Sequence, residues 1–251
     1  MTSILMAVLA ALAAAAPADY DHTHGQLDMV LKQHVRDGLV NYAALKGERA
    51  ALDAYLKTAG GVPMATFQSW SKDEQLAFLI NLYNATTLQV IVDAYPVDSI
   101  KSLGSLLSSP WEKETVLLFG KRVSLDTLEH KIIRKNYAEP RIHFALVCAA
   151  MGCPPLRAEA YAGAKLDEQL DSQTRTFLTT PEKNRADIAE KKLLLSPIFK
   201  WYRDDFETGS QSLAAFVAPY MSGADSQADL ECFDIAFTDY DWSLNDRPES
   251  R

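Results

Sequence analysis

The chain has 251 residues, of which 48% are hydrophobic and 23% charged, proportions that are ordinary for a globular protein able to bury a core. Its net charge is −8 and its isoelectric point is near 5.1, and no basic run or basic stripe interleaved with aromatic residues occurs. These features argue against nucleic acid as a partner.

An apolar, Ala-rich run opens the chain. Residues 4–16 read ILMAVLAALAAAA, a length and composition that predict a secretory signal peptide over residues 1–18. Met1-Thr2-Ser3 carries no Lys or Arg, which departs from the usual pattern. The alternatives are a disordered or helical Ala-rich start on a cytosolic protein and, less favoured, an uncleaved anchor. The run is too short for an ordinary spanning helix. We expect a periplasmic or secreted protein, a single domain over residues 19–251, and no stable membrane insertion after leader removal.

Apolar periodicity and turn signals predict mostly helices with a few separated strands. The expected helices cover residues 25–35, 45–56, 72–94, 127–135, 166–178 and 213–217. The expected strands cover residues 40–42, a hairpin at 115–119 and 122–124, and residues 142–147 and 233–237. Because strands and helices do not alternate regularly, the pattern favours a helix-rich α+β domain with a small antiparallel or mixed sheet.

The long apolar helix predicted at 72–94 carries a polar stripe. Glu74, Asn81 and Asn84 recur at helical spacing on an otherwise apolar segment, so their polar groups need partners. One interpretation is a cleft in which Glu74 orients a catalytic imidazole and the two amides bind substrate or an oxyanion. The alternative is structural. Glu74 completes a capping box with Ser71, and the amides bond to the backbone of a loop.

The segment from His143 to Leu156, HFALVCAAMGCPPL, brings two cysteines close to a histidine. A neighbouring imidazole can activate a thiol as a nucleophile, so Cys148, Cys153 and His143 are the candidate catalytic residues. The alternatives are a buried cysteine without chemistry or a disulfide between the pair. The spacing matches no strong zinc pattern, and we expect neither a metal nor another cofactor.

Two further polar residues flank this segment. His130 lies on the helix predicted at 127–135 and is a candidate second acid or base, although a surface position is the alternative. Arg141 directly precedes His143 and is a candidate for binding a substrate carboxylate, with a surface ion pair as the alternative.

Several stretches together resemble the family called domain of unknown function 547 (DUF547). They are NYAAL at 41–45, residues 70–96, 108–111, LEH at 128–130, residues 140–156 and YDWSLN at 240–245. The resemblance implies an exported bacterial protein and is compatible with a papain- or transglutaminase-like thiol site. In those enzymes the cysteine precedes the histidine, whereas here His143 comes first.

Two functions follow as hypotheses. The first is a thiol-dependent hydrolase or acyltransferase that acts on an amide, peptide or thioester. The second is a non-catalytic periplasmic protein that binds a small ligand and has a structural disulfide. A protein–protein adaptor is a weaker third reading, which would require an exposed apolar patch. The expected partner is a small molecule or peptide, and the oligomeric state is not predicted.

Overall fold

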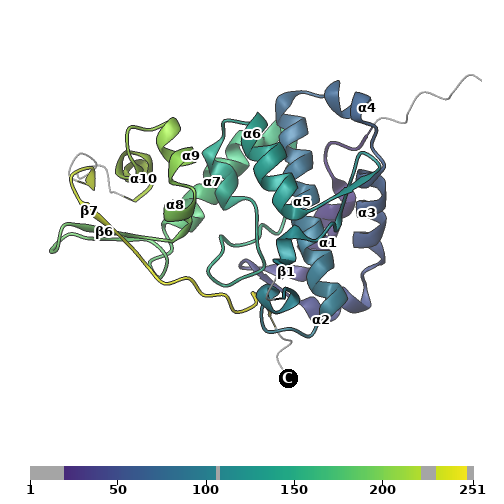
Figure 1. Cartoon of the computed structure of the whole chain (residues 1–251), viewed down its shortest axis with the longest axis horizontal. Coiled ribbons are helices and arrows are strands. Elements are labelled where there is room, and N and C mark those ends of the chain that lie inside the picture. Colours follow the sequence, from purple (N-terminus) through teal and green to yellow (C-terminus); the bar gives the residue numbers. More distant parts are fainter. Residues whose placement is uncertain (1–19, 106–107, 222–229, 248–251) are drawn as a thin grey trace, which may run out of the picture.

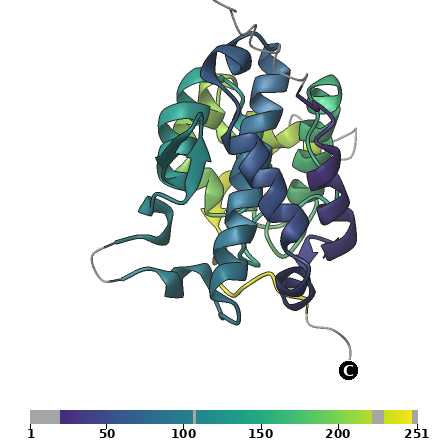
Figure 2. The same cartoon turned by 90° about the vertical axis from the view of Figure 1, so that its right-hand side faces the viewer.

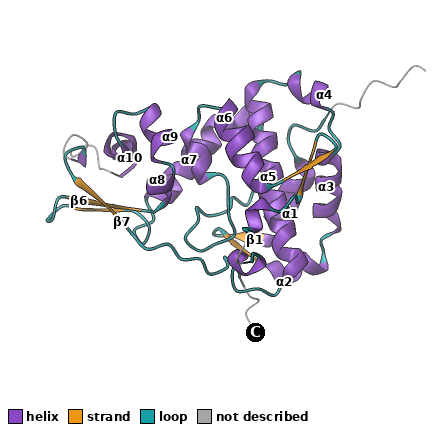
Figure 3. Ribbon diagram, viewed as in Figure 1, coloured by secondary structure: helices purple, strands orange, loops and turns teal. Residues whose placement is uncertain are grey.

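The computed structural model describes residues 20–105, 108–221 and 230–247, so the predicted signal peptide lies outside the described residues (Figure 1). Helices form a large body, and a smaller lobe of short helices and strands lies beside it (Figures 1 and 3). The strands are short and lie at the edges of the helical mass (Figure 3). The prediction of a helix-rich α+β domain is confirmed.

The body is built around one long helix. Figure 2 shows three of its helices standing side by side, and α3 contacts both α1 and α5. The helical elements of the body are α1 (Gly25–His34), α2 (Tyr42–Gly47), α3 (Ala50–Gly60), α4 (Met64–Gln68), α5 (Lys72–Ala94), η1 (Ile100–Leu103), η2 (Pro110–Glu112), η3 (Thr127–Ile133) and α6 (Arg134–Asn136). Its strands are the hairpins β1 (Val35–Arg36) with β2 (Leu39–Val40) and β3 (Val116–Leu118) with β4 (Lys121–Val123).

The second half of the chain forms the lobe and its connection to the body. Its helical elements are η4 (Pro140–Phe144), η5 (Gly163–Lys165), α7 (Leu166–Leu178), α8 (Ile198–Trp201), α9 (Arg203–Thr208) and α10 (Leu213–Met221). Its strands are β5 (Arg185–Asp187), β6 (Lys192–Leu195) and β7 (Asp234–Phe237), in a sheet of order β5-β6-β7. β5 pairs antiparallel and β7 parallel with β6, so this small sheet is mixed.

Two clusters of buried apolar side chains hold the fold together. The body cluster surrounds α5 and includes Leu79 and Ile80, whereas the lobe cluster surrounds Phe144, Phe199 and Phe206. Helix α7 joins them, because its first turns pack into the body cluster and its last turn into the lobe cluster. The seam between the clusters is where side chains from both halves of the chain meet.

Helix α5 begins and ends as its sequence predicts. Ser71 accepts from the Glu74 amide while the Glu74 carboxylate accepts from the Ser71 amide, a complete capping box. The helix is long and apolar enough to cross a membrane, but 89% of its most apolar window is buried inside the protein. It is therefore a core helix of the body.

The strand predicted at residues 142–147 is wrong. Pro140 opens the short 3₁₀ helix η4, and the Glu139 side chain accepts from the Arg141 amide at its start. No strand lies beside this segment among the described pairings. Its Ala145 carbonyl and Val147 amide bond instead to the Asn84 side chain on α5. The apolar composition reflects burial between the two clusters and not sheet pairing.

Candidate functional site

A cleft of about 290 Å³ lies at the seam between the body and the lobe. The body contributes mainly polar and aromatic side chains, namely Tyr83, Ser109, Trp111, Asp126, Glu129 and His130. The lobe and the C-terminal segment contribute mainly rings, namely Ile198, Trp201, Tyr202, Tyr240 and Trp242. Cys148 and Cys153 lie between these two sides, which gives the cleft sulfur, carboxyl and aromatic groups within one small volume.

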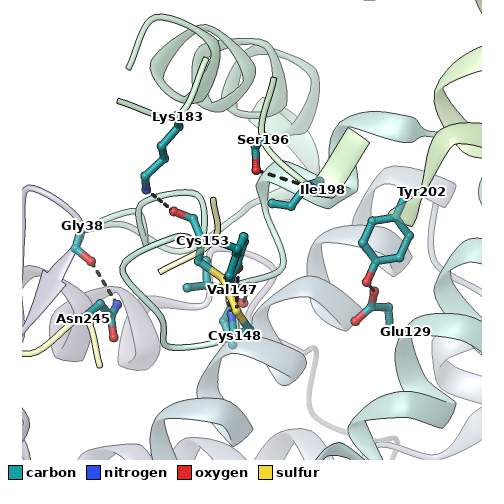
Figure 4. The surroundings of a disulfide bond; sticks show 12 residues. Gly38, Glu129, Val147, Cys148, Cys153, Lys183, Ser196, Ile198, Tyr202 and Asn245 are labelled. Carbon is teal, nitrogen blue, oxygen red and sulfur yellow. Dashed lines mark hydrogen bonds between the residues drawn. A yellow bond between two sulfur atoms is a disulfide. The ribbon is translucent and has the colours of Figure 1, made fainter. Parts of the chain in front are cut away.

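Cys148 and Cys153 form a disulfide in the wall of this cleft (Figure 4). Cys153 is 3% exposed, whereas Cys148 is only partly buried. Of the three interpretations that the sequence leaves open for this pair, namely a catalytic thiol, a buried cysteine without chemistry and a disulfide, the structure shows the disulfide. Cys232, the remaining cysteine, is a free thiol on the surface.

The loop between the two cysteines is held by the C-terminal segment. The Met151 amide donates to Ser243 O at 2.8 Å, and the Gly152 amide donates to Asp241 O at 2.7 Å. A Cβ at Gly152 would lie 2.9 Å from the backbone N and O of Asp241, so only glycine fits this approach. The Lys183 ammonium also donates to the Cys153 carbonyl (Figure 4). The sulfurs are therefore mounted on a loop with several long-range anchors.

Two donors surround the sulfur of Cys153. The Cys148 amide lies 3.0 Å from it, and the Tyr240 hydroxyl lies 3.2 Å from it. The same hydroxyl is 3.2 Å from the Cys148 sulfur. Burial, reinforced by Glu129, raises the pKa of Tyr240 far above its ordinary value, so this hydroxyl keeps its proton at neutral pH.

Glu129 lies on the cleft wall within the seven-residue π-helix η3, a helix type that is frequent at functional sites. Its side chain accepts a hydrogen bond from the Tyr202 hydroxyl at 2.7 Å (Figure 4). Burial and the nearby Glu129 raise the pKa of both Tyr202 and Tyr83, so these phenols remain protonated. Glu129 is thus a buried acid that faces the cleft from between two phenols.

The neighbouring His130 presents a hydrogen-bond donor. Its Nδ1 lies 2.9 Å from Nη1 of Arg134, and a guanidinium can only donate. Nδ1 must therefore accept, which places the ring proton on Nε2, 3.6 Å from Oδ1 of Asp126. The imidazole in the cleft is held in the form that donates from Nε2 and cannot take up a proton there.

His143 lies behind the cleft wall. Its Nε2 is 2.7 Å from Oδ2 of Asp205, and its ring stacks on Tyr202 with centroids 3.8 Å apart. Burial lowers the pKa of His143 despite the hydrogen bond to Asp205. For Asp205, burial opposes ionisation, but hydrogen bonds from His143 and Arg134 hold its pKa well below the ordinary range. Among the described contacts, none joins the His143 ring to either sulfur.

Several aromatic rings, here called the aromatic rim, line the same cleft as Glu129. The ring of Tyr240 lies 4.6 Å from that of Trp242 and 4.8 Å from that of Trp201, measured between centroids. Trp111 reaches the same rim, 6.0 Å from Trp242. The Lys101 ammonium lies 4.1 Å from the centroid of Trp242, so one ring of the rim already attracts a cation.

The polar stripe on α5 has structural partners. Asn81 bonds through both ends of its amide to the Tyr161 backbone, at 2.7 and 2.9 Å. Asn84 does the same for Ala145 and Val147, and it thereby positions the segment that leads to Cys148. Glu74 caps its helix and lies 3.7 Å from His22, away from the cleft. Both ends of each amide are thus bonded to loop backbone, and neither Asn81 nor Asn84 is among the residues that line the cleft.

Of the eight site residues predicted from sequence, the structure brings Cys148, Cys153 and His130 together in the cleft. His143 lies behind the Tyr202 ring that lines the cleft. Arg141 lies outside the cleft and forms ion pairs with Glu139 and Asp167. Sequence reasoning did not select the acids and rings of the cleft. The signal was present, because the stretches at 108–111, 128–130 and 240–245 that carry the family resemblance all contribute to its lining.

Comparison with known proteins gives one match. Residues 67–178 match the family described as "Protein of unknown function, DUF547", which confirms the resemblance seen in the sequence. The matched range contains the body side of the cleft and both cysteines, whereas Trp201, Tyr202, Tyr240 and Trp242 lie outside it. No curated protein and no solved structure matches the chain. The papain- or transglutaminase-like architecture therefore stays a prediction.

Proposed function

We propose from the site alone that this chain is an exported protein that binds a small organic cation in its aromatic cleft. The family that matches residues 67–178 is described as one of unknown function and adds no activity. The observation that carries the proposal is that a buried acid, Glu129, lines the same cleft as several tryptophan and tyrosine rings. Ligand sites are typically concave and mostly apolar, with a few polar groups that fix orientation.

The chemistry of the wall favours a positive charge on the ligand. Ring faces attract ammonium and guanidinium groups, most strongly when the site excludes water. Lys101 over Trp242 shows this attraction within the chain itself. Glu129 and Asp126 add carboxyl groups to the same cleft, from which a cationic group would gain charge-assisted hydrogen bonds. His130 offers an Nε2 donor for a second polar group of the ligand.

The volume of the cleft limits the size of the ligand, and the disulfide bears on the compartment in which the protein is found. A cleft of about 290 Å³ suits a ligand at the small end of the usual range. A disulfide persists in oxidising compartments and is rare in the cytosol, so the Cys148–Cys153 pair supports the expectation of export. The predicted periplasmic or secreted location is part of the proposal for this reason.

Thiol-dependent acyl transfer is the second candidate and stays a prediction for the reduced protein. The thiolate is the nucleophilic form of cysteine, and the oxidised pair contains none. His143 is directed to Asp205, and His130 is held as a donor by Arg134, so neither ring is placed as a base for a sulfur. These contacts favour ligand binding over catalysis by a resting thiolate.

Binding is tested with three small probes, namely benzylamine, tetramethylammonium and the neutral benzyl alcohol. Because Trp111, Trp201 and Trp242 line the cleft, occupancy should change tryptophan fluorescence in a saturable manner. We expect benzylamine to bind at least roughly tenfold more tightly than benzyl alcohol, the effect of about 1.4 kcal/mol from the cation. Equal affinities for the amine and the alcohol would refute a cation site.

Glu129→Gln isolates the acid. Glutamine can still accept from Tyr202, whereas the charge is lost, so we expect benzylamine affinity to fall by roughly tenfold to a hundredfold. The matched control is Glu168→Gln on the exposed face of α7, which removes the same charge and should leave affinity unchanged. If Glu129→Gln folds, as judged by circular dichroism, and binds benzylamine like the unmodified protein, the proposal fails.

A further inference from the structure

The disulfide of the cleft differs from a purely structural crosslink in its exposure. Its two sulfurs line a cavity, and they are unequal, because Cys148 is partly accessible while Cys153 is 3% exposed. A thiol that enters the cleft therefore reaches the Cys148 sulfur first. Access and the quality of the leaving sulfur both determine which atom of a disulfide is attacked.

The hydrogen bonds around the two sulfurs, like the difference in exposure, favour attack at Cys148 with Cys153 as the leaving sulfur. If a thiolate attacks the Cys148 sulfur, the electron pair of the broken bond goes to the sulfur of Cys153. That sulfur already has the Cys148 amide at 3.0 Å, which distinguishes it from the Cys148 sulfur, and the Tyr240 hydroxyl at 3.2 Å, a distance that both sulfurs share. Two donors aimed at an atom where negative charge develops stabilise that charge without rearrangement. The leaving sulfur thus lies in a preformed anion hole.

We propose that the Cys148–Cys153 disulfide undergoes thiol–disulfide exchange with a small aminothiol that binds in the cleft, with Cys148 as the attacked sulfur and Cys153 as the leaving sulfur. The exchange itself goes beyond the binding function proposed above. The preference for an amine on the thiol rests on that function, because Glu129 and the aromatic rim would hold the ammonium group.

The step balances with thiols alone. The thiolate RS⁻ forms a bond to the Cys148 sulfur, the bond between the two cysteines breaks, and Cys153 becomes a thiolate. A second RS⁻ then attacks the R sulfur of the mixed disulfide, which releases RSSR and the Cys148 thiolate. Two molecules of RSH are oxidised and one protein disulfide is reduced, and the two thiol protons end on the cysteines through solvent. The disulfide RSSR drives the reverse reaction.

The loop geometry favours reclosure of the ring. Backbone bonds from the loop to Asp241 and Ser243 do not involve the sulfurs, so they survive reduction. Lys183 on the Cys153 carbonyl likewise survives. The two thiols therefore stay close, and an intramolecular attack of Cys153 on a mixed disulfide at Cys148 is fast. Reversible exchange is expected from this arrangement.

Exchange is tested on the full chain carrying Cys232→Ser, which removes the exposed third thiol. Cysteamine and 2-mercaptoethanol are each reacted with the protein and, for reference, with oxidised glutathione, and acid-quenched samples are read by mass spectrometry. We expect the protein disulfide to react at least roughly tenfold faster than oxidised glutathione, given two donors on the leaving sulfur. A rate at or below that of glutathione disulfide would overturn the exchange.

The attacked atom is identified with single-cysteine variants. Cystamine should modify Cys148 rapidly in the Cys153→Ser variant and Cys153 only slowly in the Cys148→Ser variant. Faster modification of Cys153 would overturn the assignment.

Tyr240→Phe should slow reduction of the intact disulfide by roughly tenfold, whereas Tyr137→Phe, which removes a hydroxyl bonded to Gln75 outside the cleft, should not. Equal slowing in both variants would contradict the role of Tyr240.

The two proposals fail separately in this design. Each thiol's rate on the protein is divided by its rate on oxidised glutathione, which removes intrinsic differences between the thiols. A ratio higher for cysteamine than for 2-mercaptoethanol supports the aminothiol class, and equal ratios overturn it. Benzylamine binding is measured on the same preparations. Intact binding without exchange refutes only the exchange, and exchange without binding refutes only the cation site.

Discussion

Two groups of polar side chains in this protein have different relations to their surroundings. On α5, Asn81 and Asn84 use both ends of their amides on the backbone of neighbouring loops. In the cleft, Glu129 and His130 bond to other side chains and also line an open volume. The first group holds loops against the core helix, and the second offers an acid and a hydrogen-bond donor to a ligand in the cleft.

The comparison shows why burial and polarity alone do not identify a site. A buried amide is costly unless its groups are paired, and loop backbone is the commonest partner available. Both groups satisfy this requirement, so the difference lies in what else the side chain faces. The α5 amides face closed packing, whereas the acid of η3 faces the cleft. The following predictions separate the two roles by measuring stability and binding independently.

The largest effect is expected from Asn84→Leu. The substitution leaves the Ala145 carbonyl and the Val147 amide buried without partners. We expect the free energy of unfolding to fall by about 2–5 kcal/mol, since each orphaned group costs about 1–3 kcal/mol. Urea denaturation followed by circular dichroism measures this change. Asn136→Leu at an exposed position is the control and should change the free energy by less than about 0.5 kcal/mol.

Benzylamine binding by the Asn84→Leu molecules that remain folded separates a structural role of Asn84 from a role in ligand binding. If Asn84 acts only on the loop that leads to Cys148, benzylamine affinity per folded molecule should change little. A variant with normal stability and abolished binding would reverse the comparison, because it would place the amide among the ligand contacts.

The pH dependence of stability is expected to come from the body and not from the cleft. Burial lowers the pKa of His24 from 6.5 to about 4, although Asp21 partly opposes the shift. The unfolded chain binds this proton below about pH 6.5 and the folded chain does so only near pH 4, so stability falls as pH decreases through that window. The full loss is about 3 kcal/mol, at 1.36 kcal/mol per pKa unit.

Replacement of His24 tests this assignment. His24 has a φ of 52°, a conformation that asparagine tolerates, so His24→Asn should keep the turn before α1. Urea midpoints at about pH 8 and about pH 4.5 should differ less in the variant than in the unmodified protein. A smaller slope should remain, because burial also lowers the pKa of His143. An unchanged slope in His24→Asn would assign the pH dependence to other groups.

Local signals in the sequence predicted the elements that depend on local physics. The capping box at Ser71 and Glu74 marked the start of α5, and apolar periodicity matched α7 over 166–178. The hairpin of β3 and β4 followed from its turn at Gly120. The fold class was also predicted correctly, and the resemblance to DUF547 is matched over residues 67–178. In each case the information lies within a few residues or in a whole-chain pattern.

The cleft depends on contacts between distant residues, which no local pattern contains. Tyr202 lies 73 positions from Glu129, and Tyr240 lies 92 positions from Cys148, yet both pairs are in hydrogen-bonding contact. The strand predicted at 142–147 failed for a related reason. Its apolar composition indicated burial, but the partner that satisfies its backbone is the Asn84 side chain on a helix. Tertiary contacts overrode local propensity there.

The smallest effect is expected from substitution of Glu74, which tests whether this carboxylate caps its helix or acts as a catalytic acid. A capping box accepts either Glu or Gln at this position, so Glu74→Gln should leave the free energy of unfolding nearly unchanged. Glu74→Ala removes the bond to the Ser71 amide and should cost about 0.5–1 kcal/mol. Since Glu74 lies outside the cleft, benzylamine binding and thiol exchange should be normal in both variants, as measured by fluorescence and mass spectrometry. If Glu74→Gln lost benzylamine binding or thiol exchange while its stability stayed intact, Glu74 would be a functional residue and its part in the capping box would be secondary.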